Sequence, residues 1–211
     1  MARAWLVGII FSALIGAGCG DNAPPVQKID PVKAEMIKQV QRERSNIARF
    51  QIQVRGRYNA QEYMQCRFHD EFSKTSRLRS AERTAARKKL LAQAKEEIKR
   101  HEAEFASLGE NYRDTRSQVS LTNLQRAATA NFDLGIRISA DVLNRQEISL
   151  RERQMRFERD RNKLTTEKRE AEESALEKLH DSVAKRRAHI TLVNQNRDAV
   201  INMTINALLR N

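Results

Sequence analysis

Four histidines are the first candidates for chemistry, because imidazole binds metals and transfers protons near neutral pH. Glu177 and His180 have the Glu-x-x-His spacing with which helical bundles bind a pair of metal ions. Such a centre needs a second copy of this motif and two further carboxylates. None of the other three histidines has a carboxylate three residues before it. We therefore predict that the chain holds no di-metal centre.

A second group of candidate ligands lies in the segment 62–70. Cys66, His69 and Asp70 would share one face of a continuous helix, with Glu62 one turn earlier. Thiolate, imidazole and carboxylate are the groups that bind Zn²⁺. A single group of this kind on a highly charged helix is usually coincidental, so we predict no metal site here.

Motifs for other reactions are missing from the sequence. It contains no Gly-rich phosphate loop, no G-x-S-x-G elbow and no paired nucleophile and base. The acidic residues alternate with Lys and Arg at helical spacing, which is typical of ion pairs on helix surfaces. We predict a protein that is not an enzyme, with no catalytic residue and no cofactor.

Basic residues give the chain a net charge of +12. They cluster at 83–89, 151–163 and 185–187, which favours anionic partners such as an anionic envelope surface. A solvated Arg-rich surface without a partner is the alternative. Acidic residues interrupt the later clusters and aromatic residues are scarce, so nucleic acid is not an expected partner.

The elements that must carry these residues are long helices. Aromatic residues are 5% of the chain, charged residues are 31%, and there are only seven Gly and three Pro. Few helix breakers among many helix-favouring residues predict an all-α fold. The buried surface of such helices is a narrow stripe, which does not easily enclose a pocket.

Two helical arms and a turn are predicted after residue 29. Asp30 as N-cap and Pro31 at the first helical position begin the first arm, 30–108, with a break near 73–80 where the heptad frame shifts. Gly109 is predicted to cap this arm, and 109–116 to form the turn. The second arm is 117–211, and its apolar carboxyl end is predicted to dock on a partner helix.

The second arm carries an apolar seam through which we expect contacts with helices of a partner or of another copy. Its first part has a spacing of seven, and its second part alternates threes and fours. The seam residues are Ile136, Leu143, Leu150, Phe157, Leu164, Leu176, Leu179, Val183, Ile190, Val193 and Val200. The arms predict one long antiparallel hairpin or coiled-coil bundle. An extended parallel homodimer with a kink at Gly109 is the alternative.

The amino terminus has the order of features that export requires. Arg3 precedes an apolar run from Trp5 to Ile15, and small residues follow at 16–18. From Trp5 to Ala17 a helix would measure roughly 20 Å, too short for a hydrocarbon core of about 30 Å. Residues 1–18 are therefore predicted to be a cleaved signal peptide. A short membrane anchor is the alternative.

Cys19 follows Gly16-Ala17-Gly18, and this stretch resembles a bacterial lipoprotein signal, although Gly16 stands where the family usually has Leu. The resemblance implies that Cys19 becomes the lipidated first residue and that 19–29 is a short tether. Gly20, in place of Asp, implies the periplasmic face of the outer membrane. A soluble periplasmic or secreted protein is the alternative. The resemblance covers about 20 residues.

Address and shape together predict a non-catalytic envelope lipoprotein that serves as a helical scaffold or assembly protein. Two other functions remain open at this point. One is a periplasmic holdase chaperone, although the chain lacks the short strand segments with which such chaperones trimerise. The other is an exported helical component of a secretion or conjugation apparatus.

Overall fold

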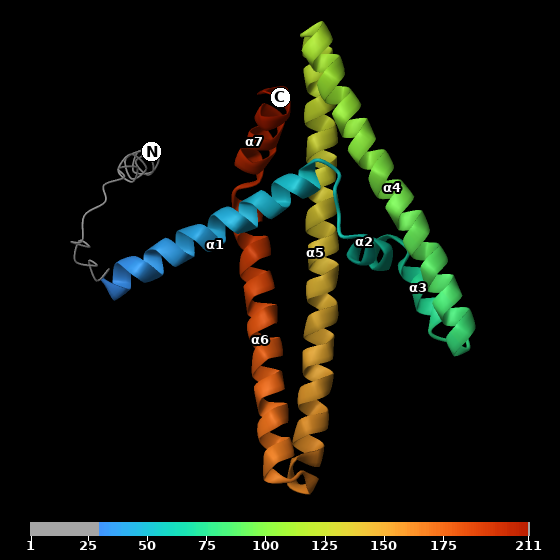
Figure 1. Cartoon of the computed structure of the whole chain (residues 1–211), viewed down its shortest axis with the longest axis vertical. Coiled ribbons are helices and arrows are strands. Elements are labelled where there is room, and N and C mark those ends of the chain that lie inside the picture. Colours follow the sequence, from blue (N-terminus) through green and yellow to red (C-terminus); the bar gives the residue numbers. More distant parts are fainter. Residues whose placement is uncertain (1–29, 211) are drawn as a thin grey trace, which may run out of the picture. The chain divides into compact units, whose positions relative to one another are not determined.

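In the computed structural model of the chain, residues 30–210 are described. The predicted signal peptide (1–18), Cys19 and the tether (19–29) lie outside this range. Residues 30–210 form α-helices and one 3₁₀ turn, with no strand, which confirms the all-α class (Figure 1). The elements are α1 Pro31–Val54, α2 Ala60–Arg67, α3 His69–Thr75, α4 Ser80–Thr115, α5 Gln118–Asp160, the 3₁₀ turn Arg161–Lys163, α6 Thr166–Gln195 and α7 Arg197–Arg210.

The chain divides into two compact units after Lys38, within α1, and each has its own packing. In the unit that begins at Gln39, α5 is the central helix. It packs against α2, α4, α6 and α7, and α7 also packs against α4. The long helices α4, α5 and α6 therefore form two successive hairpins that share α5.

The connection between α1 and α2 depends on one glycine. Gly56 has φ of +84°, and a Cβ at this position would lie 2.8 Å from the backbone carbonyl carbon of His101 in α4. A residue with a side chain would meet strain and a clash with backbone here. Asn59 then caps α2, because its side-chain oxygen accepts hydrogen bonds from the N–H groups of Gln61 and Glu62.

Phe68 separates α2 from α3. Its φ of −109° and ψ of 41° are not helical, so the helix is interrupted at this residue. The expectation that Cys66, His69 and Asp70 share one helix face is therefore wrong. Cys66 lies near the end of α2, whereas the other two residues are in the first turn of α3.

The loop between α3 and α4, residues 76–79, is held by two arginines of α4. The Arg83 guanidinium donates hydrogen bonds to the carbonyls of Ser76 and Leu78, at 3.2 and 2.9 Å. The Arg87 Nε donates to Thr75 Oγ1 at 3.0 Å. The two Arg83 bonds satisfy carbonyls of the loop, and the Arg87 bond ties the Thr75 side chain at the end of α3 to α4.

The prediction that Gly109 caps the first arm is wrong, because α4 continues through it to Thr115. Gly109 is buried against α7, and a Cβ there would lie 2.4 Å from Leu208 Cδ2. The glycine permits the two helices to approach closely, a role that local sequence does not distinguish from a cap.

The reversal between α4 and α5 takes only the two residues Arg116 and Ser117. Arg116 has the left-handed conformation that often follows a helix, with φ of 47°, and its N–H donates to the Tyr112 carbonyl. Ser117 caps α5 by accepting a hydrogen bond from the N–H of Ser120. The turn is therefore shorter than the predicted range 109–116 and overlaps it only at Arg116.

The second arm is not one rod but folds back on itself at 161–165. After Asp160 a single 3₁₀ turn ends at Lys163, and Leu164 is extended. Thr165 then caps α6, its hydroxyl oxygen accepting from the N–H of Lys168. The apolar spacing of seven continues through Leu164 and does not indicate this reversal. The same spacing is expected in one long helix and in two helices that face each other.

One apolar cluster joins five helices around the amino-terminal third of α5. Phe132 of α5 is fully buried, and its ring centroid lies 5.8 Å from that of Phe50 in α1. The buried members of the cluster are Phe50, Val54, Phe105, Leu124, Ala128, Phe132, Val193, Val200, Ile201 and Ile205. The carboxyl-terminal helix α7 thus docks inside its own chain.

A second cluster joins α2 and its flanking residues to α4 and α5. Its buried members are Tyr58, Tyr63, Met64, Ala94 and Ile138. Two buried hydrogen bonds fix this region to α5. The Tyr58 hydroxyl donates to the Asn131 carbonyl at 3.0 Å, and the Asn131 amide donates to the Val54 carbonyl at 3.1 Å.

Candidate interaction surfaces

The predicted seam lies along two helices that pack against each other. Its residues from Ile136 to Phe157 are in α5, those from Leu176 to Val193 are in α6, and Val200 is in α7. Leu164 is in the connection. Five seam residues are buried and the remaining six are half-buried; the buried ones are Leu150, Phe157, Val183, Val193 and Val200.

Ion pairs fix the direction of the α5–α6 hairpin. Glu147 pairs with Arg187, and Arg153, further along α5, pairs with Glu172, which comes earlier in α6. Residues further along α5 thus pair with residues earlier in α6, so the two helices are antiparallel. The five buried seam residues are packed by the chain's own helices, whereas the six half-buried ones keep part of their surface exposed.

The basic cluster at 185–187 is neutralised within the chain. Lys185 pairs with Asp181 of the same helix. Arg186 reaches Glu62 of α2, and Arg187 reaches Glu147 of α5. Arg186 and Arg187 thus link α6 to its neighbours, and all three cations of this cluster have an acidic partner.

Much of the cluster at 151–163 is neutralised in the same way. Arg153 makes two hydrogen bonds to the Glu172 carboxylate, and this guanidinium holds the pKa of Glu172 below its usual value. Arg161 pairs with Glu173, and Lys163 pairs with Asp160. The α5–α6 end, which we define as residues 151–173, has eight basic and seven acidic residues.

The basic cluster at 83–89 differs from the other two. We define the α3–α4 end as residues 72–95, which contain eight basic residues and one acidic residue, Glu82. The Glu82 carboxylate accepts a hydrogen bond from the backbone N–H of Arg79 at 3.4 Å. No basic residue of the α3–α4 end takes part in an ion pair within residues 30–210. These 24 residues carry a net charge of about +7, and they are directly flanked by Asp70, Glu71, Glu96 and Glu97.

The first turns of α1 expose apolar side chains. In the unit that ends at Lys38, Val32 and Met36 are 68% and 63% exposed. In the second unit Val40 is 47% exposed. All three side chains belong to the one helix α1, and their spacing of four places them on one side of it. We call these three exposed residues the apolar stripe of α1.

The candidate metal ligands are not brought together. Glu177 and His180 are both exposed on α6, and Glu62 faces Arg186. Burial raises the pKa of the Cys66 thiol. Within residues 30–210 no three His, Cys, Asp or Glu side chains are grouped as metal ligands would be.

A polar cluster between α2 and α4 was not predicted. The Tyr63 hydroxyl donates to Glu97 Oε2 at 2.7 Å and lies 3.3 Å from His101 Nε2. Burial, followed by the bond to Glu97, raises the pKa of Tyr63. The raised pKa keeps the hydroxyl protonated as a donor, so the cluster ties α2 to α4. The only local signal for this arrangement is the Asn59 cap that places Tyr63 one turn later.

Residues 30–210 are all-α and built from helical hairpins. They include the exposed apolar stripe of α1 and a basic end without ion pairs. No described helix is long and apolar enough to cross a membrane. No family model matches the sequence, and no curated protein and no solved structure matches it either.

Proposed function

We propose that the chain is a non-catalytic envelope lipoprotein, attached to the periplasmic face of the outer membrane through Cys19 and acting as a helical scaffold or assembly protein. The observation that carries the scaffold role is the exposed stripe on α1. Its side chains are apolar and remain exposed. The buried residues of the predicted seam are packed within the chain, so we take the stripe as the proposed contact for a partner helix.

The stripe has the form that helix-to-helix contacts use. Val32, Met36 and Val40 recur every four residues, which places them on one side of α1. Burying such side chains contributes roughly 25 cal/mol for each Å² of apolar surface removed from water. Charges of both signs flank the stripe, including Lys33 and the ion pair between Lys38 and Glu35. This favours a protein partner that offers an apolar groove with charged edges.

Site-specific crosslinking tests this role. A photo-crosslinking amino acid is placed at Met36 or Val40, and at Ser45 as a control on the opposite side of α1. We expect the first two positions to capture the same small set of proteins in intact cells, identified by mass spectrometry, and Ser45 not to capture them. Capture of many unrelated, unfolded proteins would favour a holdase chaperone instead. Equal capture from all three positions would overturn the assignment of the stripe.

Acylation and export are tested separately. We expect the amino-terminal peptide isolated from membranes to begin at Cys19 and to carry acyl chains, measured by mass spectrometry. Cys19→Ala should release the chain from the outer-membrane fraction in a high-salt wash, because several acyl chains hold a protein firmly whereas the described helices are not membrane-spanning. An unmodified Cys19 in a membrane-bound chain would contradict the lipoprotein assignment.

A further inference from the structure

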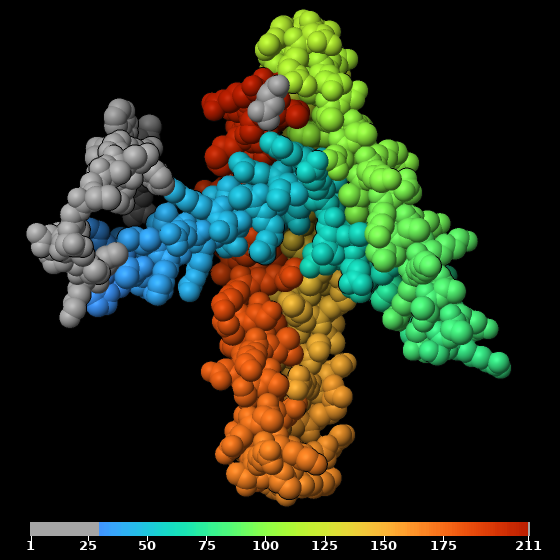
Figure 2. Space-filling model, viewed as in Figure 1, coloured from blue at the N-terminus to red at the C-terminus, as the bar shows by residue number. Residues whose placement is uncertain are grey.

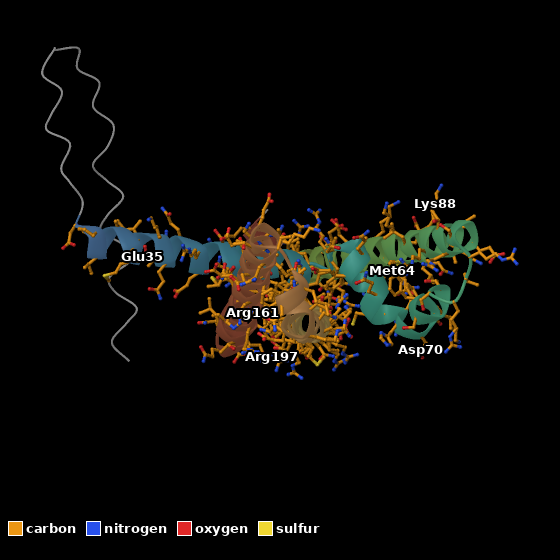
Figure 3. The ribbon with its side chains drawn as sticks, turned by 90° about the horizontal axis from the view of Figure 1, so that it is seen from below. Glu35, Met64, Asp70, Lys88, Arg161 and Arg197 are labelled. Atoms are coloured by element: carbon orange, nitrogen blue, oxygen red, sulfur yellow. The ribbon has the colours of Figure 1, made fainter. Side chains whose placement is uncertain are left out.

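The loop between α3 and α4 presents an apolar residue among unpaired cations. Leu78 is 37% exposed, and it is flanked by the exposed Arg77 and Arg79. Lys74 is exposed at the end of α3, and Lys88 is exposed on α4. In Figure 3, Lys88 projects from the side of α4 away from α3, whereas Asp70 lies on α3.

The loop is held in place by cations that are already used. Arg83 bonds to the carbonyls on both sides of Arg77, those of Ser76 and Leu78. The Arg87 guanidinium bonds to Thr75 and lies over the Phe72 ring, 4.6 Å from its centroid. The backbone of the tip is therefore ordered by the chain itself, and the remaining cations are left to face outward. The space-filling view shows this end of α3 and α4 uncovered by other described helices (Figure 2).

We propose that the α3–α4 end binds the headgroups of an anionic lipid surface, with Leu78 entering the interface between headgroups and acyl chains. Lys and Arg near such a surface are attracted to its negative potential. Their aliphatic stems allow the charged groups to stay at the phosphates while a neighbouring apolar residue goes deeper. Mutual repulsion among unpaired cations is also relieved when anions approach.

A membrane surface fits better than nucleic acid. Duplex binding depends on phosphate contacts from basic residues and has no use for Leu78. Single strands are held by bases stacked on aromatic rings, and Phe72, the aromatic ring of this end, is covered by Arg87. This inference goes beyond the proposed function, because it requires neither acylation of Cys19 nor a protein partner.

A local fluorescent reporter tests the proposal on the full chain. Every form carries Cys19→Ser, so acyl chains do not contribute, and Trp5→Phe, which removes the single tryptophan. Leu78→Trp then reports on the α3–α4 end, and Asn162→Trp, in a separate form, reports on the α5–α6 end. The probes are vesicles of phosphatidylglycerol with phosphatidylethanolamine, neutral phosphatidylcholine vesicles and duplex DNA.

We expect anionic vesicles to shift the emission of the Leu78→Trp form to shorter wavelength and to protect it from acrylamide, with reversal at high salt. The Asn162→Trp form should not respond. The reporter form that also carries both Arg77→Gln and Lys88→Gln should bind anionic vesicles about 25-fold more weakly. Each cation near an anionic surface contributes roughly fivefold to the affinity. Both side chains are exposed, so we expect these substitutions to leave the fold intact, and circular dichroism checks this.

Each other result overturns the proposal. An equal response to neutral vesicles means that charge has no role, and equal responses from both reporters mean that this end is not selected. No response to either vesicle rejects lipid binding. A response to DNA without a response to anionic vesicles assigns the surface to nucleic acid instead.

Discussion

The α3–α4 end and the α5–α6 end each contain eight basic residues, but the structure uses them differently. At the α5–α6 end, seven acidic residues accompany them. Arg153 of α5 and Arg161 of the 3₁₀ turn pair with Glu172 and Glu173 of α6. At the α3–α4 end, the single acid Glu82 serves a backbone cap. Basic residues therefore close one hairpin and remain available at the other, a distinction that net charge alone does not make.

The apolar core between the ends should dominate stability. We expect Phe132→Ala to lower the free energy of unfolding by about 3–5 kcal/mol, because the ring is fully buried against Phe50. Val119→Ala is the matched control, since this side chain of α5 is 71% exposed, and should change it by less than about 0.5 kcal/mol. Urea unfolding followed by circular dichroism measures both. Similar effects for the two variants would mean that the core is not where Phe132 places it.

Acid should act on the core before it acts on either end. Burial, with smaller contributions from Arg49 and Arg186, lowers the pKa of His189 from 6.5 to about 4. In the unfolded chain His189 binds a proton below about pH 6.5, whereas in the folded chain it does so only below about pH 4. The free energy of unfolding therefore decreases as the pH drops from 6.5 to 4, and this loss is absent above pH 6.5.

His189→Leu tests this part of the pH dependence. The wild-type chain should lose about 1–2 kcal/mol more than the variant between pH 7 and pH 4, a figure reduced from the full shift because the ring is only half-buried. Urea unfolding at several pH values provides the measurement. Parallel pH profiles for the two chains would exclude His189 as the group responsible.

The paired end should respond to charge reversal with a smaller effect. Arg153→Glu removes two hydrogen bonds to Glu172 and places two carboxylates together, so Tm should fall by a few degrees. Glu172→Arg in the same chain should restore Tm, because the pair is then reversed. As Arg153 also lowers the pKa of Glu172, the contribution of the pair should fade as pH drops below the ordinary value of 4.5. Failure of the double variant to recover would mean that the pair does not hold the hairpin.

Sequence periodicity predicts which residues prefer burial but not which surface covers them. The spacing of Leu150, Phe157 and Val183 indicated an apolar seam, and all three are buried. The same spacing suggested a contact with another chain, because a stripe on a single rod and two stripes in a hairpin look alike. Gly109 was likewise ambiguous, since a close helix contact and a helix cap both require a small residue.

Local hydrogen-bonding signals at helix starts predict a part of the fold that apolar periodicity does not. Asn59 and Thr165 are polar residues at helix starts, and each accepts a backbone N–H. Recognising Thr165 would have divided the second arm. The pairing of Arg186 with Glu62, 124 residues away, lay beyond any local signal. The exposure of the apolar side chains of α1 could not be predicted either, because exposed and buried apolar residues have the same spacing along a helix.

The most direct measurement combines stability and lipid binding for charge reversal at the two ends. Arg77→Glu with Lys88→Glu is compared with Arg153→Glu with Lys163→Glu, by urea unfolding and by sedimentation with anionic vesicles, all in the Cys19→Ser chain. The account predicts that the first pair leaves stability unchanged or slightly higher and sharply reduces vesicle binding, whereas the second pair lowers stability and leaves binding of the folded chain intact. Loss of vesicle binding from both pairs, or loss of stability from both, would contradict the division of roles between the two ends.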